Sequence, residues 1–167
     1  MEHNVIKIKE RTQPTSNGMT KVLMISTDTK ILESDSPVRV RMREYGSLFH
    51  ELHIVLFCLK RKDVPSRIQI SDNTHVYPTH SVSKLLYVKD AEKIGCQIIH
   101  DAKLLDADSV ITTQDPFETG HVGRGLSKRS RIPLHVQIHT DFYSILYGIK
   151  TNSQILCGYG SIRIFFR

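Results

Sequence analysis

The sequence predicts an α/β domain of Rossmann type, in which a mostly parallel sheet carries helices on both faces. Two patterns predict it. Short apolar runs, typical of parallel strands buried on both faces, alternate with stretches whose apolar residues recur at three- and four-residue steps, typical of helices. Strands and helices that alternate in this way form a parallel sheet with right-handed crossovers. The length of 167 residues allows one good hydrophobic core, so we expect one such domain.

The composition argues against several classes of protein. No apolar run approaches the roughly 18 residues of a membrane span. The charged N-terminus lacks the apolar core of a signal peptide, and we therefore expect a cytoplasmic protein. The three cysteines, Cys58, Cys96 and Cys157, are far apart and odd in number. This spacing favours reduced thiols over disulfides or a zinc site, and no metal site is predicted.

The net charge of +6 favours an acidic partner such as nucleic acid, anionic lipid or a phosphorylated ligand, although it can serve solubility alone. Basic residues gather in two clusters, at positions 39–43 and 124–131. Neither cluster is interleaved with the aromatic residues that stack on single-stranded bases. We therefore expect no nucleic acid partner.

The domain proper is predicted to begin at residue 20, after a flexible lead-in over 1–19. The apolar run 21–26 predicts a central strand, and a polar loop follows it. Ser36 and Pro37 then predict the cap and the first position of a helix. Four residues are expected on the apolar face of this helix: Val38, Met42, Tyr45 and Phe49.

The loop between this strand and this helix lacks the G-x-G-x-x-G fingerprint, so the usual dinucleotide site is not supported. An anion can still sit at the helix N-terminus near Ser36, assisted by Arg39, because free backbone N–H groups and the helix dipole favour negative charge there. The alternative is that Arg39 belongs to a solvated basic flank.

Further strands and helices are predicted in alternation. A second strand is expected over 52–59, and two short strands, 68–70 and 75–77, flank a turn. A helical pattern covers 83–105 and is weakened locally by Gly95. The remaining predicted elements are a strand from Ser109 that ends at Gln114, a helix over 117–128 and a strand over 134–138.

Polar residues follow the last two predicted strands at the point where each strand ends. Gln114 and Asp115 follow one strand, and His139 and Asp141 follow the other. In open α/β sheets, ligands bind at the carboxyl ends of the strands. We therefore predict that Asp115 and His139 share one rim of the sheet.

Several segments together resemble the N-terminal domain of glycosyltransferase family 4, the retaining, nucleotide-sugar-dependent enzymes of GT-B fold. The resemblance covers roughly residues 21–143. Its most specific parts are two blocks in this order, Asp115-Pro-Phe-Glu-Thr-Gly120 and His139-Thr-Asp-Phe142. It is also carried by three earlier segments: Lys21-Val-Leu-Met-Ile-Ser26, Ser36-Pro-Val-Arg-Val-Arg-Met-Arg-Glu-Tyr-Gly46 and Glu51-Leu-His-Ile-Val55.

The resemblance implies a two-domain enzyme in which this half binds a sugar or lipid-linked acceptor and the other half binds the nucleotide sugar. No cofactor or metal is implied, since the nucleotide sugar is a substrate. His139 and Asp115 are the implied catalytic positions. Asp115 could act as a base, because burial raises the pKa of a carboxylate and lets it accept a proton. The implied substrate-binding positions are Gln114, Glu118, Thr119, Gly120, Thr140, Asp141 and Arg39.

Plainer interpretations accompany these assignments. Asp115 can cap the following helix, and Glu118 can interact with that helix's dipole. His139 can be a satisfied core histidine, and Asp141 can cap a turn. His135 is expected to be structural.

Residues 145–167 depart from the family, and the sequence shows no second domain with charges for a diphosphate. We therefore interpret the chain as truncated or frameshifted and expect little activity from it alone. The alternative is that the tail forms one extra strand or hairpin, because residues 155–157 and 162–166 have strand composition. An alternative function is a non-catalytic module that binds a phosphorylated metabolite. A third interpretation is peripheral attachment to the anionic inner membrane face through the arginine-bearing helix.

Overall fold

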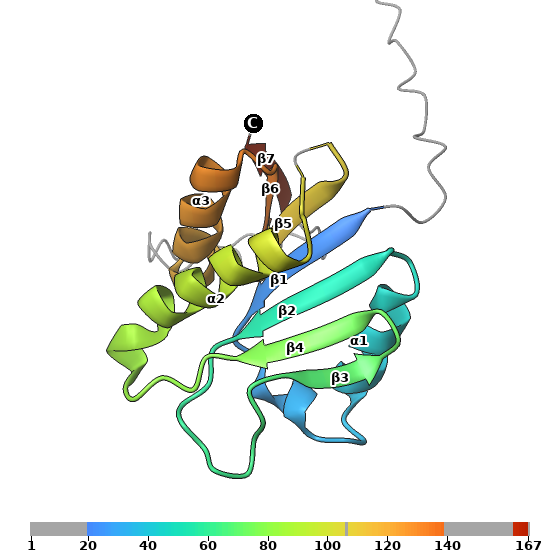
Figure 1. Ribbon diagram of the computed structural model, residues 1–167, viewed down its shortest axis with the longest axis vertical. Coiled ribbons are helices and arrows are strands. Elements are labelled where there is room, and N and C mark those ends of the chain that lie inside the picture. The colour runs from blue at the N-terminus through green and yellow to red at the C-terminus, as the bar shows by residue number, and fades with distance from the viewer. Residues whose placement is uncertain (1–19, 106, 139–161, 167) are drawn as a thin grey trace, which may run out of the picture.

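The computed structural model describes residues 20–105, 107–138 and 162–166, and these form a seven-stranded sheet with three α-helices (Figure 1). The strand order is β3-β4-β2-β1-β5-β6-β7. The strands are β1 (Lys21–Ser26), β2 (Glu51–Leu56), β3 (Ile68–Ser71), β4 (Thr74–Pro78), β5 (Ser109–Thr113), β6 (Leu134–Ile138) and β7 (Ile162–Phe166). The helices are α1 (Pro37–Gly46), α2 (Tyr87–Asp101) and α3 (Glu118–Ser130), with 3-10 turns η1 (Thr29–Leu32) and η2 (Lys84–Leu86).

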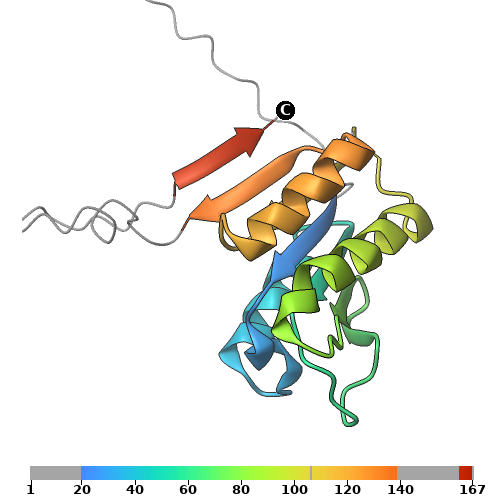
Figure 2. The same ribbon diagram turned by 90° about the vertical axis from the view of Figure 1, so that its left-hand side faces the viewer.

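Five strands, β4, β2, β1, β5 and β6, pair in parallel, and an antiparallel strand closes each edge. β3 closes one edge, and β7, in the tail where strand composition was noted, closes the other beside β6 (Figure 2). The predicted Rossmann-like, mostly parallel α/β fold is confirmed.

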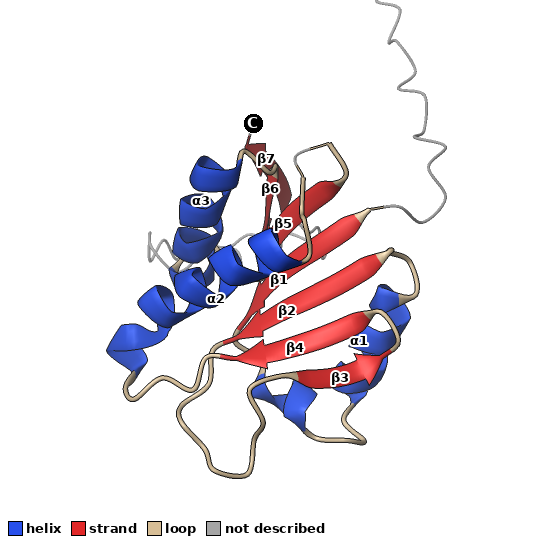
Figure 3. Cartoon of the chain, in the orientation of Figure 1, coloured by secondary structure: helices blue, strands red, loops and turns tan. Residues whose placement is uncertain are grey.

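Helices cover both faces of the sheet, as predicted (Figure 3). On one face α1 and η1 pack over side chains of the central strands, including Val22, Met24 and Ile54. On the other face α2 and α3 pack over the alternate side chains, including Leu23 and Ile25. Because successive side chains of a strand point to opposite faces, both faces of β1 are buried, which is why its sequence reads as a continuous apolar run.

The first helix begins as predicted and ends earlier than its apolar pattern suggests. The Ser36 Oγ accepts a hydrogen bond from the backbone N–H of Arg39 at 3.1 Å, and Pro37 occupies the first turn. Val38 and Met42 are buried. The helix ends at Gly46, however, so Phe49 lies beyond it, and Tyr45 is 41% exposed. The predicted four-residue apolar face is therefore wrong for these two positions.

The second helix is shorter than predicted, because the segment from Ser83 forms the 3-10 turn η2 before α2 begins. The sequence showed Gly95 only as a weak helix former, but in the structure this glycine has a packing role. A Cβ atom placed there would lie 2.5 Å from Cδ1 of Leu126, so the glycine lets α2 and α3 approach closely.

The chain reverses its direction of travel across the sheet between β1 and β5. After β1 the chain forms β2, β3 and β4, which all lie on one side of β1 in the sheet. Helix α2 then leads to β5, which lies on the other side of β1. The carboxyl ends of β1 and β5 therefore flank a topological switch point. Within the described residues, none of the helices combines the length and apolarity that crossing a membrane would require.

Candidate functional site

A polar rim lies at the switch point, and we call Ser26, Gln114, Asp115 and Glu118 the carboxyl rim. Ser26 is the last residue of β1 and Gln114 directly follows β5. The Ser26 hydroxyl donates to the Oε1 of Gln114 at 2.7 Å and accepts from the backbone N–H of Asp28 at 3.1 Å. This pair joins the two strand ends and fixes the side chain of Gln114.

The loop after Gln114 is held by its own side chains. The Asp115 Oδ1 accepts from the backbone N–H of Phe117 at 2.8 Å. The Thr119 hydroxyl donates to the Asp115 carbonyl at 3.0 Å, and the Asp115 N–H lies 3.2 Å from that hydroxyl. A Cβ at Gly120 would lie 3.0 Å from the same carbonyl. Thr119 and Gly120 are buried, so in this structure they shape the loop, whereas Glu118 is exposed.

Asp115 precedes the helix rather than occupying its cap. The cap residue of α3 is Phe117, which makes no side-chain capping bond. The Asp115 carboxylate instead closes a turn just before the helix, which is a common use of aspartate. Glu118 lies in the first turn of α3, where a carboxylate interacts favourably with the helix dipole.

The other predicted site residues are placed only in part. β5 and β6 are parallel neighbours, with Thr113 opposite Val136, so the two strands are adjacent as predicted, while the shared rim of Asp115 and His139 stays a prediction. His139, Thr140 and Asp141 lie outside the described residues. His135, expected to be structural, lies with its Nδ1 at 3.3 Å from the Thr112 hydroxyl.

Arg39 lies in the first turn of α1, next to its Ser36 cap. Its Nε is buried and makes no hydrogen bond within the described part of the chain. No hydrogen bond among those residues connects Arg39 to the Gln114–Gly120 loop.

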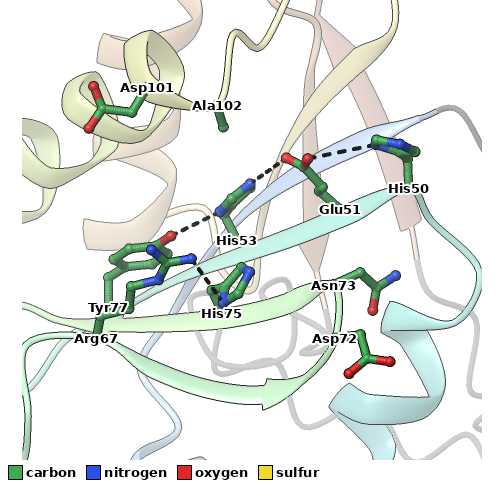
Figure 4. A pocket seen from close by; sticks show the side chains of 10 residues that line it. All are labelled: His50, Glu51, His53, Arg67, Asp72, Asn73, His75, Tyr77, Asp101 and Ala102. Carbon is green, nitrogen blue, oxygen red and sulfur yellow. Dashed lines mark hydrogen bonds and ion pairs between the residues drawn. The ribbon is translucent and has the colours of Figure 1, made fainter.

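A second polar region was not predicted from the sequence. It is a pocket of about 370 Å³ on the part of the sheet beside the C-terminal end of α2 (Figure 4). We call it the histidine pocket. Its lining residues are His50, Glu51, His53, Arg67, Asp72, Asn73, His75, Tyr77, Asp101 and Ala102.

His53 is the centre of this pocket and is only 5% exposed. Its Nδ1 lies 3.2 Å from the Tyr77 hydroxyl, and its Nε2 lies 3.1 Å from Oε2 of Glu51. A carboxylate can only accept, so Nε2 carries the proton and donates to Glu51. In the neutral ring Nδ1 then accepts from the Tyr77 hydroxyl. Both ring nitrogens are therefore satisfied within the protein.

Burial and charge set the pKa values in the histidine pocket. Burial lowers the pKa of His53, against the opposing effect of Glu51. Burial raises the pKa of Glu51, but the hydrogen bond from His53 and the charge of Lys21, whose Nζ lies 3.4 Å from Oε2, outweigh it and leave that pKa lowered. His53 is thus a neutral ring beside an ionised carboxylate near neutral pH.

The outer part of the histidine pocket is formed by His75 and Arg67. The rings of His53 and His75, which are opposite each other on β2 and β4, are stacked with centroids 5.7 Å apart. The Arg67 Nη2 lies 3.3 Å from Nδ1 of His75, which must accept because a guanidinium only donates. Burial, followed by the charge of Arg67, lowers the pKa of His75.

The sequence signal for this pocket was weak. A histidine inside the apolar β2 run and the alternation of His75 and Tyr77 in β4 are each unremarkable alone. Only the β2–β4 register brings them together. No group of three or more histidine, cysteine or acidic side chains in the described ranges is arranged to hold a metal ion.

Comparison with known proteins adds no family assignment. No protein-family model matches the chain, and no curated protein matches it. The resemblance to glycosyltransferase family 4 therefore rests on the motifs quoted above and stays a prediction.

Proposed function

We propose that this chain is the acceptor-binding half of a retaining, nucleotide-sugar-dependent glycosyltransferase. The observation that supports the proposal best is the Ser26–Gln114 pair, which fixes polar side chains at the β1–β5 switch point. In open α/β sheets this is the position where ligands bind. The motifs of the resemblance, from Asp115 to Gly120, lie at the same sheet end.

The chemistry of the carboxyl rim suits sugar hydroxyl groups. Oε1 of Gln114 is occupied by Ser26, so its amide N–H groups remain as donors for a ligand. Asp115 uses Oδ1 for the Phe117 N–H and retains Oδ2 as an acceptor. Glu118 adds an exposed carboxylate on the first turn of α3. Such a set provides both donors and acceptors, as a polyol requires.

In the complete reaction an acceptor oxygen would form a bond to the anomeric carbon while the bond from that carbon to the nucleotide diphosphate breaks. Asp115 or His139 would receive the acceptor proton. Donor binding would be supplied by a second domain. A cytoplasmic location, with the acceptor at the inner membrane face, belongs to the same proposal.

Acceptor binding by the full chain tests this proposal. Calorimetric titration with candidate sugars and micellar glycolipids should show binding that falls about tenfold in Gln114→Ala and in Asp115→Ala, since each loses about one hydrogen bond to the ligand. His75→Gln, in the histidine pocket, is the matched control and should bind normally. Binding that survives both rim variants and is lost in the control would contradict the proposal.

A second candidate function, a non-catalytic module that binds a phosphorylated metabolite, is favoured by one observation. Nε of Arg39, in the first turn of α1, is buried and makes no hydrogen bond within the described ranges. A phosphate at this helix N-terminus would supply an acceptor. Titration with inorganic phosphate and nucleotide sugars separates the two candidates, because tight binding that Arg39→Gln abolishes would favour the module.

A further inference from the structure

Large apolar side chains are exposed on the loops that follow the carboxyl ends of β2 and β4. Leu85 is 92% exposed and Val82 is 80% exposed, and Leu59 is also exposed. Folding does not bury these side chains in either hydrophobic core. Exposed apolar residues that cluster, rather than scatter singly, indicate an interaction surface.

The two loops lie side by side, so their apolar residues form one surface. Leu59 pairs with Ser81 in an isolated parallel bridge, and the Lys60 N–H donates to the Ser81 carbonyl at 2.9 Å. Val82 follows directly, and Leu85 lies in η2. The arrowheads of β2 and β4 in Figure 1 point toward these loops.

Lysines accompany the apolar residues on the same loops. Lys60, Lys62 and Lys84 are all exposed, and none has an ion-pair partner among the described residues. Arg61, between the first two, is instead paired with Asp63 at 2.8 Å. We call this surface the apolar–basic edge: Leu59, Lys60, Lys62, Val82, Lys84 and Leu85.

We propose that the apolar–basic edge docks on the surface of an anionic bilayer. Val82 and Leu85 enter the boundary between headgroups and acyl chains, while the three lysines contact lipid phosphates. Apolar side chains combined with lysines are the composition that binds anionic lipid interfaces. Charge complementarity selects the occupant, because an apolar protein partner would leave the lysines without anions.

The apolar–basic edge differs from the arginine-bearing helix that the sequence suggested as a membrane contact. In α1 the Arg43 Nε donates to the Ile70 carbonyl at 3.3 Å, and the Nε of Arg39 is buried. Two of its three arginines therefore point partly into the protein. Docking through the apolar–basic edge does not require the chain to bind a sugar. Such docking would bring lipid-linked acceptors to the same sheet end as the carboxyl rim.

Sedimentation of the full chain with vesicles tests the proposal. Vesicles of phosphatidylcholine with phosphatidylglycerol should bind the protein in a salt-dependent way, and vesicles of phosphatidylcholine alone should bind it weakly. The double variant Val82→Ser with Leu85→Ser should reduce partitioning at least about tenfold. Lys60→Glu, Lys62→Glu and Lys84→Glu should each reduce it about fivefold or more.

Two matched controls lie elsewhere on the chain. Leu48→Ser changes an apolar side chain that is 68% exposed just beyond α1, and Lys128→Glu reverses an exposed lysine near the end of α3. Both should bind vesicles as the unmodified chain does. Absence of salt-dependent binding, or binding lost in Arg41→Glu on α1 and retained in the apolar–basic variants, would overturn the proposal. Because these vesicles contain no sugar, the result is independent of acceptor binding.

Discussion

The carboxyl rim and the histidine pocket are both polar, yet they use their polar groups in opposite ways. In the histidine pocket the side chains of Glu51, His53 and Tyr77 satisfy one another. In the carboxyl rim Ser26 holds Oε1 of Gln114 and the Phe117 N–H holds Oδ1 of Asp115, and the proposal assigns the remaining polar atoms of these two side chains to a ligand. The polar groups at the centre of the histidine pocket therefore stabilise the fold, and the comparison teaches that polar residues lining a hollow need not be free to bind a ligand.

His53→Ala should have the largest effect on stability. The substitution removes a buried ring and takes one hydrogen-bond partner from both the Tyr77 hydroxyl and the Glu51 carboxylate, which costs about 2–3 kcal/mol. Urea denaturation measures the loss. His75→Ala, at the outer part of the same pocket, should cost clearly less. Equal losses in the two variants would mean that the His53 hydrogen bonds are not what stabilises this region.

Acid should destabilise the fold through His53. Its pKa is lowered in the folded chain, so the unfolded chain binds more protons below the ordinary histidine value of about 6.5. Stability should therefore fall as the pH drops from about 6.5 towards the folded pKa. Glu51 adds its own loss only at lower pH, because its folded pKa lies below the usual carboxylate range. Thermal unfolding of His53→Gln between about pH 7 and pH 5 should show a flatter dependence than the unmodified chain, and an unchanged slope would contradict this assignment.

The sequence predicted those parts of the fold that depend on local patterns. The apolar run of β1 and the Ser36–Pro37 helix start are local signals, and both are confirmed. The exposure of Tyr45 and the packing role of Gly95 depend on which element lies opposite, and no local pattern contains that information.

The same distinction explains the site residues. Gln114 and Asp115 were predicted as site residues because polar residues directly follow an apolar strand, and the structure places both at the carboxyl end of β5. The histidine pocket was missed because His53 and His75 are 22 positions apart in sequence and meet only through strand register. Arg67, the partner of His75, comes from the segment before β3, and the sequence of that segment shows no pattern that predicts a binding site.

Gln114→Ala should cost less stability than the histidine variants, and it probes the opposite region. Ser26 would lose its acceptor but still accept from the Asp28 N–H, so we expect a loss below about 1 kcal/mol. Urea denaturation beside His53→Ala measures the difference between the two regions. A loss as large as that of His53→Ala would mean that the carboxyl rim, like the pocket, is built for stability, and the contrast would disappear.

Arg67→Ala should have the smallest effect on stability and would show where the internal network of the pocket ends. The guanidinium is exposed and lies 5.8 Å from the centroid of the Tyr77 ring, an arrangement that contributes about 0.5 kcal/mol at an exposed site. Its charge also lowers the pKa of His75, so its removal should raise that pKa towards the ordinary value. A titration of the His75 ring followed by NMR measures the shift, with Arg61→Ala, in the preceding loop, as the matched control. If Arg67→Ala left the His75 titration unchanged and cost more than about 1 kcal/mol, Arg67 would belong to the stabilising network, and that network would extend to the outer part of the pocket.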